Sequence, residues 1–143
     1  MKIVFDTNVL ISTFVFKGFS KEVFEYCFSY HQLYTSPWIL NEFREKMREK
    51  LKVPEDRISV VIALIEEGFK IVNPTGALPR ICRDEDDNNI LLLAKFIKAE
   101  YIVTGDKDLL SLIEYEGTQI ESPRGFWEKA IKEEKKRRTP SSA

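Results

Sequence analysis

The chain has 143 residues, of which 43% are hydrophobic, 31% charged and 12% aromatic, with a formal net charge of −1. This length fits one domain with a single core, and the composition excludes a disordered, collagen-like or linker-dominated chain. No apolar stretch reaches the 18 or more residues of a membrane span, and Asp6 interrupts an apolar start that lacks a signal-peptide cleavage site. We therefore expect a cytoplasmic protein without membrane contact, whose cysteines, Cys27 and Cys82, are buried thiols.

Charge is distributed unevenly along the chain. Residues 128–143 hold six basic and three acidic residues, whereas the residues before them hold 16 basic and 20 acidic ones. A basic end is compatible with a nucleic-acid partner and equally with a solvated helix end. We expect residues 1–122 to form the main body of the domain and residues 123–143 to add a C-terminal helix with a frayed, basic tail to the same domain.

Short β-rich runs alternate with longer segments of helical periodicity. Predicted strands cover residues 2–5, 32–35, 69–72, 101–104 and 118–120. Predicted helices cover residues 8–15, 20–30, about 37–51, about 54–68, 84–99 and 107–113, and a terminal helix begins at residue 123. This alternation predicts an α/β fold, a three-layer Rossmann-like parallel sheet flanked by helices.

Local signals support several of these boundaries. Ser36 and Pro37 are typical of a helix start, and Gly68 is typical of a helix end. The acidic run 84–87 also favours a helix start, and the preceding residues 73–83 form the one long loop.

Four acidic residues are predicted to meet at one edge of the sheet. Asp6 ends the first strand, and Asp106 follows the strand 101–104. Glu42 lies in the second turn of the helix after the second strand, and Asp87 lies in the first turn of the helix after the long loop. Parallel strands end, and the helices after them begin, at the same edge, where α/β proteins bind ligands. Four separate segments therefore bring carboxylates to one side of the sheet.

Taken singly, three of these acids have structural explanations. The acid at position 87 can stabilise a helix N-terminus, Glu42 can be one charge on a solvated helix, and Asp106 can be a turn or cap residue. Asp6, at the end of an apolar strand, is atypical of a purely structural acid. The convergence of all four favours a functional site.

A cluster of carboxylates needs protons or a cation, because two like charges about 4 Å apart repel by roughly 4 kcal/mol at an effective dielectric of 20. Oxygen ligands without cysteine or clustered histidine select Mg²⁺ or Mn²⁺ rather than zinc, and such ions suit hydrolysis of phosphate esters. The single histidine, His31, is predicted to lie in a polar loop without a nearby nucleophile, and no phosphate-binding glycine loop is present in the sequence.

Four segments together resemble the PIN domain family of nucleases. They are FDTNVLIS at 5–12, SPWILNEF at 36–43, RDEDDNNILLLA at 83–94 and YIVTGDKDLL at 101–110. The resemblance extends over about residues 2–122 and is strongest to the prokaryotic branch of toxin components of toxin–antitoxin systems. It implies a metal-dependent endoribonuclease that cuts RNA by in-line attack of a metal-activated water. In that family pattern, an acidic quartet holds Mg²⁺ or Mn²⁺, and here its members are Asp6, Glu42, Asp87 and Asp106.

The resemblance also implies roles for neighbouring residues. Asn8 and Thr104 would support the metal ligands, and Asp108 would replace or assist Asp106. The spacing to Ile90 favours Asp87 over Asp86 as the third acid.

Basic and aromatic side chains near the same edge are candidates for RNA contacts. Arg83 and Lys107 are the best placed to bind phosphates, ahead of Arg44 and Lys46, although each is equally well explained as a surface charge. Trp38 and Phe43 can stack on bases, but their spacing within an apolar helix favours core packing.

The family analogy further suggests an RNA substrate, a small antitoxin that covers or enters the acidic groove, and a homodimer. Three alternatives stay open: a housekeeping RNA-processing nuclease, a PIN-like module that binds RNA or protein without cleavage, and a receiver-like signalling domain. The last needs a phosphorylatable aspartate at the end of a central strand, and neither the strand end at Tyr34-Thr35 nor the one at Val72-Asn73 supplies it. A phosphatase of the haloacid-dehalogenase type is disfavoured, because it needs a second aspartate where this chain has Asn8.

Overall fold

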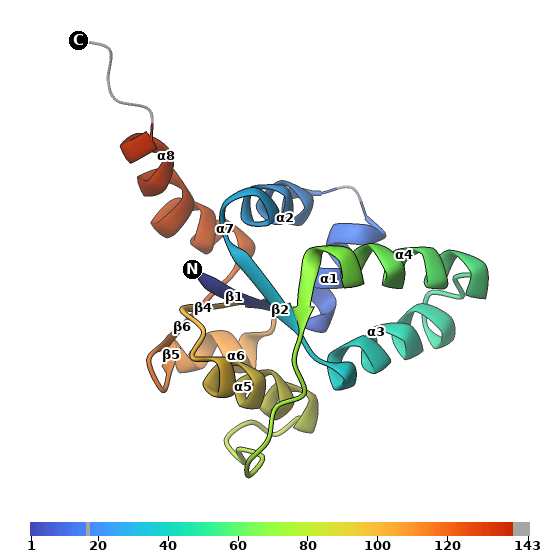
Figure 1. The fold of residues 1–143 in the computed structure, drawn as a ribbon. Helices are drawn as coiled ribbons and strands as arrows, with labels where there is room; N and C mark the ends of the chain where they lie inside the picture. Colours follow the sequence, from blue (N-terminus) through green and yellow to red (C-terminus); the bar gives the residue numbers. More distant parts are fainter. Residues whose placement is uncertain (17, 139–143) are drawn as a thin grey trace.

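A computed structural model describes residues 1–16 and 18–138 and contains a six-stranded sheet in the order β3-β2-β1-β4-β6-β5 (Figure 1). The strands are β1 Lys2–Phe5, β2 Gln32–Thr35, β3 Phe69–Ile71, β4 Tyr101–Val103, β5 Glu114–Tyr115 and β6 Thr118–Glu121. Neighbouring strands are parallel except for β5, which runs antiparallel to β6. In the centre, Ile3 of β1 pairs with Leu33 on one side and Tyr101 on the other.

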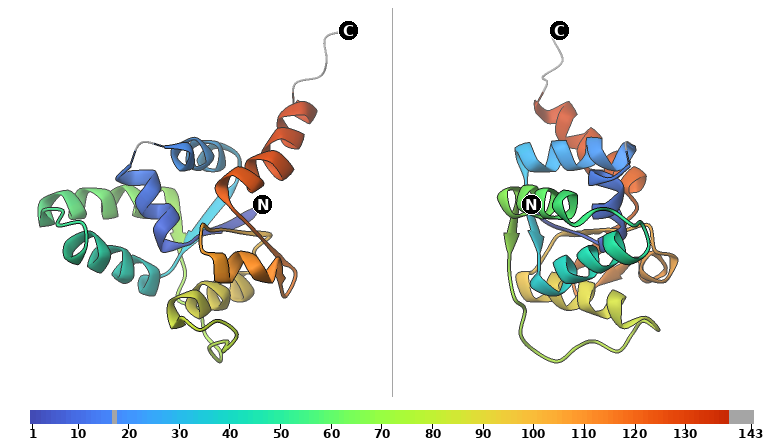
Figure 2. Two further views of the ribbon diagram at one scale, coloured as in Figure 1. Left: turned by 180° about the vertical axis from the view of Figure 1, so that it is seen from behind. Right: turned by 90° about the vertical axis from the view of Figure 1, so that its right-hand side faces the viewer.

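Helices cover both faces of this sheet. They are α1 Thr7–Phe14, α2 Phe19–Tyr30, α3 Pro37–Glu49, α4 Glu55–Gly68, α5 Glu85–Ile97, α6 Lys107–Leu112, α7 Pro123–Phe126 and α8 Lys132–Arg138. Helices α1, α2 and α4 lie on one side and α5 and α6 on the other (Figures 1 and 2). The predicted three-layer α/β fold with a mostly parallel sheet is confirmed. Among the described residues, no helix combines the length and the apolar character that crossing a bilayer requires.

The local boundary signals act as predicted. The Ser36 hydroxyl accepts a hydrogen bond from Ile39 N at 3.1 Å, and Pro37 opens α3. Asp84 is the N-cap of α5. Helix α4 ends at Gly68, where a Cβ atom would lie 3.1 Å from the Phe28 ring, so a larger residue would push that ring away.

Two elements differ from the expectation. The short strand β5 was missed, because two residues are too few to show a periodic pattern; it turns into β6 through Glu116 (φ 51°) and Gly117 (φ 87°). The terminal helix begins at Pro123 as predicted, but a π-helical turn, Trp127–Ile131, interrupts it. The predicted frayed end, residues 139–143, lies outside the described residues.

The core contains three fully buried phenylalanines, Phe5, Phe43 and Phe126. The core-packing interpretation is thereby confirmed for Phe43, whereas Trp38 is 36% exposed and it was wrong for that residue. Cys27 is buried as expected, but Cys82 is only partly buried, so the prediction of two buried thiols was half wrong.

His31 lies in the bend between α2 and β2, as the prediction of a polar loop requires, but its side chain is only 7% exposed. It follows α2 directly, and its Nε2 atom is 2.8 Å from Glu134 Oε2 of α8. Its Nδ1 atom is 3.0 Å from the amino group of Met1. The histidine therefore joins both ends of the described chain and does not line the cavity that holds Asp6, Glu42, Asp87 and Asp106.

Ile113 has an unfavourable backbone conformation, with a φ of +66° although its side chain is 73% exposed. A β-branched residue gains nothing here that offsets the steric cost of positive φ. We expect Ile113→Gly to raise the free energy of unfolding by about 1 kcal/mol, or the midpoint of thermal unfolding by about 3 °C. The matched change Val60→Gly, at an exposed site in α4, should lower stability. A lower unfolding midpoint for Ile113→Gly would contradict this prediction.

Candidate active site

A small cavity of about 40 Å³ lies beyond the carboxyl ends of β1 and β4, where the strand order reverses direction. We call it the acidic pocket. It is lined by Asp6, Thr7, Asn8, Glu42, Lys46, Asp84, Asp86, Asp87, Ile90 and Asp106. The structure therefore brings together all four acids expected at this edge, from α1, α3, α5 and the start of α6. Its volume is enough for an ion or a few waters.

Asp6 is fixed from two sides. It is 5% exposed and is the N-cap of α1, with Oδ1 accepting a hydrogen bond from Val9 N at 2.8 Å. Its other oxygen accepts a hydrogen bond from the Thr104 hydroxyl. Thr104 Oγ1 in turn accepts one from Asp106 N at 2.9 Å. Thr104 thus joins Asp6 and Asp106 across the ends of neighbouring strands.

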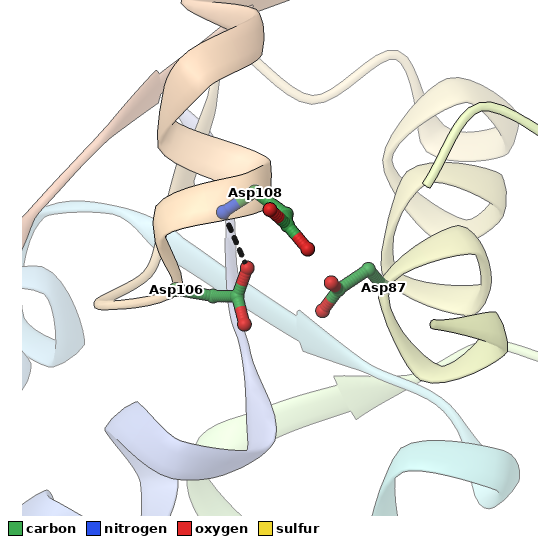
Figure 3. Close-up of side chains that lie close together, drawn as sticks. All are labelled: Asp87, Asp106 and Asp108. Atoms are coloured by element: carbon green, nitrogen blue, oxygen red, sulfur yellow. Dashed lines mark hydrogen bonds between the residues drawn. The ribbon is translucent and has the colours of Figure 1, made fainter. Parts of the chain in front are cut away.

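Three aspartates, Asp87, Asp106 and Asp108, converge between the starts of α5 and α6 (Figure 3). Asp87, Asp106 and Asp108 each offer a carboxylate oxygen within 4.8 Å of the other two. Asp106 is the N-cap of α6, and its Oδ1 accepts hydrogen bonds from Asp108 N at 2.8 Å and Leu109 N at 3.1 Å. The capping explanation is therefore confirmed for Asp106, which also lines the acidic pocket.

The basic residues predicted here differ in their contacts. Arg83 is 88% exposed and forms a two-pronged ion pair with Asp108, with both distances 3.1 Å. Lys107 is exposed at the first position of α6. Arg83 thus neutralises the outermost acid of the cluster.

Glu42 is not a solvated helix charge, because its side chain is only 11% exposed. Its Oε1 atom pairs with Lys46 Nζ at 3.1 Å, one helical turn along α3. The same ammonium donates a hydrogen bond to Asn8 Oδ1 at 3.3 Å. Lys46 is the one cation in the lining of the acidic pocket.

The electrostatics of the acidic pocket favour protons or a cation. Burial raises the pKa of Asp6 and that of Glu42 above their usual values. Burial, with the charges of Asp106, Asp84 and Asp6, raises the pKa of Asp87 to about 7. Glu42 Oε2 and Asp87 Oδ2 are buried, and no group in residues 1–16 or 18–138 forms a hydrogen bond with either oxygen. Since each such oxygen is costly to bury, this all-oxygen donor set fits a hard divalent cation.

Sequence reasoning missed residues that shape this site. Asp84, expected only at the helix start, and Asp86, the alternative to Asp87 as third acid, both line the pocket beside Asp87. Asn88 binds the preceding loop to α5: its Oδ1 accepts hydrogen bonds from Ile81 N and Cys82 N, and its Nδ2 donates to Cys82 O. Asn88 is 4% exposed, and the asparagine pair at the start of an apolar helix was the available signal.

The fold and the acidic pocket define an α/β protein with a carboxylate cluster at the switch point of its sheet. The family model of the PIN domain matches residues 2–108. The chain belongs to the PIN domain family, whose members are nucleases. The haloacid-dehalogenase and receiver alternatives are thereby excluded.

Two relatives extend this comparison. The uncharacterized protein MJ1680 of Methanocaldococcus jannaschii is 38% identical over 119 residues, which cover 78% of this chain and 75% of that protein. A chain of the crystal structure of VapBC2 from Rickettsia felis bound to a DNA fragment from their promoter has a TM-score of 0.66 and 12% identity. That match covers 85% of this chain and 98% of the other, and it shows a shared fold.

Proposed function

We propose that the protein is a metal-dependent endoribonuclease that hydrolyses RNA phosphodiester bonds at the acidic pocket. The observation that carries this proposal is the buried carboxylate cluster: four acids from four chain segments line one cavity, and two of their oxygens lack any partner. Membership of a nuclease family supports the same chemistry.

In this proposal Asp6, Glu42, Asp87 and Asp106 hold Mg²⁺ or Mn²⁺, and Asp108 assists from the rim. When bound, such an ion polarises the phosphoryl oxygen and lowers the pKa of an attacking water. Thr104 keeps Asp6 in position by its hydrogen bond.

The chain's other polar groups act on the water and the substrate. Glu42, whose Oε1 atom pairs with Lys46, would use its Oε2 atom to hold the ion directly or through water and so position the attacking water. Lys46, Arg83 and Lys107 supply positive charge to the RNA phosphates around the pocket. Asn8 orients the Lys46 ammonium.

We further propose that the enzyme is the toxin of a toxin–antitoxin pair and forms a homodimer. The similarity in fold to a chain of VapBC2 supports this. A second cavity, of about 530 Å³, is lined by apolar side chains of α1, α2 and α4, including Phe24, Phe28 and Leu64. Phe28 is 57% and Leu64 49% exposed, which is typical of a surface that binds protein.

The test of cleavage is incubation of a labelled single-stranded RNA with the protein and Mg²⁺ or Mn²⁺, with and without EDTA. We expect internal cuts that require the metal and stop with EDTA. Metal binding measured by calorimetry without any cleavage would instead favour a PIN-like binding module. A toxin should stop the growth of cells that express it, and co-expression of a small protein encoded by an adjacent gene should restore growth. A housekeeping RNA-processing nuclease should show neither effect.

A further inference from the structure

A cavity of about 330 Å³ adjoins the acidic pocket, between α1 and the C-terminal half of α3. We call it the α1–α3 groove. Its lining includes Asn8, Ser12 and Phe16 on the α1 side and Lys46 and Lys50 on the α3 side. Its volume is large enough for a group the size of a nucleotide, whereas the acidic pocket is not.

The groove is continuous with the acidic pocket, because Asn8 and Lys46 line both cavities. The Lys46 ammonium lies at their boundary, 3.3 Å from Asn8 Oδ1 and 3.1 Å from Glu42 Oε1. A strand whose phosphodiester is at the acidic pocket can therefore extend past Lys46 into the groove.

Charge distinguishes the groove from a third cavity that Lys46 also lines, on the other side of α3. The two charged side chains of the groove are both basic, Lys46 and Lys50, one helical turn apart, and the Lys46 ammonium also pairs with Glu42 Oε1 at the boundary. The neighbouring cavity along α3 has the same two lysines but four acidic lining residues, Glu42, Glu45, Glu49 and Asp86. A polyanion is repelled from that cavity and attracted to the groove.

An aromatic side chain lies at the far end of the groove. Phe16 is 55% exposed, so its ring is available to a ligand. Stacking of a base on an exposed aromatic ring contributes about 1–3 kcal/mol and does not depend on base identity. Ser12 adds a hydroxyl that can bind a ribose or phosphate oxygen.

We propose that the α1–α3 groove binds the nucleotide next to the cleaved phosphodiester of a single-stranded RNA. Lys46 and Lys50 bind its phosphates and Phe16 stacks on its base. This inference rests on the proposed nuclease function, and it adds the direction in which the bound RNA strand extends from the acidic pocket.

The test measures binding separately from cleavage. In the Asp6→Asn background with Mg²⁺, the fluorescence anisotropy of a labelled single-stranded RNA gives Kd at several salt concentrations. We expect Lys50→Ala to weaken binding about 5-fold and to reduce the slope of log Kd against log salt by about 0.7, as for one lost phosphate contact. Lys95→Ala, an exposed lysine near the far end of α5, is the control and should change neither quantity.

The aromatic contact is tested by a pair of variants. Phe16→Ala should weaken binding by about 5-fold or more, and Phe16→Tyr, which keeps the ring, should restore it. If Lys50→Ala and Phe16→Ala both bind RNA as tightly as the Lys95→Ala control, the proposed role of the groove is overturned. This holds even if the wild-type protein cleaves RNA. If Lys50→Ala and Phe16→Ala weaken RNA binding but the wild-type protein does not cleave RNA, the groove is supported and the nuclease activity is rejected.

Discussion

Replacing Asp6 with asparagine is expected to lower the rate of RNA cleavage by more than about 100-fold. Substitutions of groups that only orient a metal ligand typically cost 10–100-fold in affinity or activity, and loss of a direct ligand should cost more. Asp6 is held in place by hydrogen bonds from Val9 N and from the Thr104 hydroxyl, so its carboxylate is preorganised for a direct contact with the ion.

The folded structure should survive this change. The asparagine oxygen can still accept the hydrogen bond from Val9 N, which caps α1. The Thr104 hydroxyl can rotate to accept a hydrogen bond from the new amide group. Removal of one charge also relieves repulsion in the cluster, so the metal-free variant should unfold at the same temperature as the wild type or slightly above it.

The measurement is initial cleavage rate with Mg²⁺ or Mn²⁺, together with a thermal unfolding curve for each variant. Asp56→Asn, an exposed acid in the first turn of α4, is the matched control and should retain full activity. The cleavage rate of Thr104→Val should lie between those of the two variants, about 10–100-fold below the wild type, because Thr104 only positions Asp6. Equal cleavage rates in Asp6→Asn and Asp56→Asn would reject the metal site.

The sequence is sufficient to predict the sheet and its acidic edge because both depend on short-range patterns. Alternation of apolar runs with helical segments predicts parallel strands, and parallel strands place Asp6 and Asp106 at the same edge. The helix caps at Ser36 and Asp84 are hydrogen bonds between residues close in the chain, so the sequence predicts them equally well.

The contacts that tune the site depend on long-range packing and could not be predicted. Lys46 meets Asn8 across 38 positions of the chain, and only the packing of α3 against α1 brings them together. The ion pair of Arg83 with Asp108 likewise joins the long loop to α6. The same limit explains His31, whose partners, Met1 and Glu134, lie at the two ends of the described chain.

In metal-free buffer, the free energy of unfolding is expected to fall as the pH rises from about 5 to about 7. The pKa of Asp87 is raised to about 7 in the folded protein, against about 3.9 in an unfolded chain. Between these values the folded state binds the proton and the unfolded state does not, so stability is complete below the lower pKa and is lost as the pH rises through the upper one. The loss is at most about 1.4 kcal/mol per pH unit, and it belongs to the cluster because its acids share protons.

A divalent ion should remove this loss, since it takes the place of the protons and stabilises the folded state by about 2.7 kcal/mol at 100 times its Kd. The measurement is urea unfolding between pH 5 and pH 8, in EDTA and in Mg²⁺ or Mn²⁺. Asp87→Asn should show a flatter pH dependence in EDTA, because its amide carries no charge, and a weaker response to the metal. Asp56→Asn should follow the wild type in both buffers. Parallel curves for the wild type and Asp87→Asn would mean that Asp87 is ionised at neutral pH without a cation, and the metal would then not be needed to stabilise the cluster.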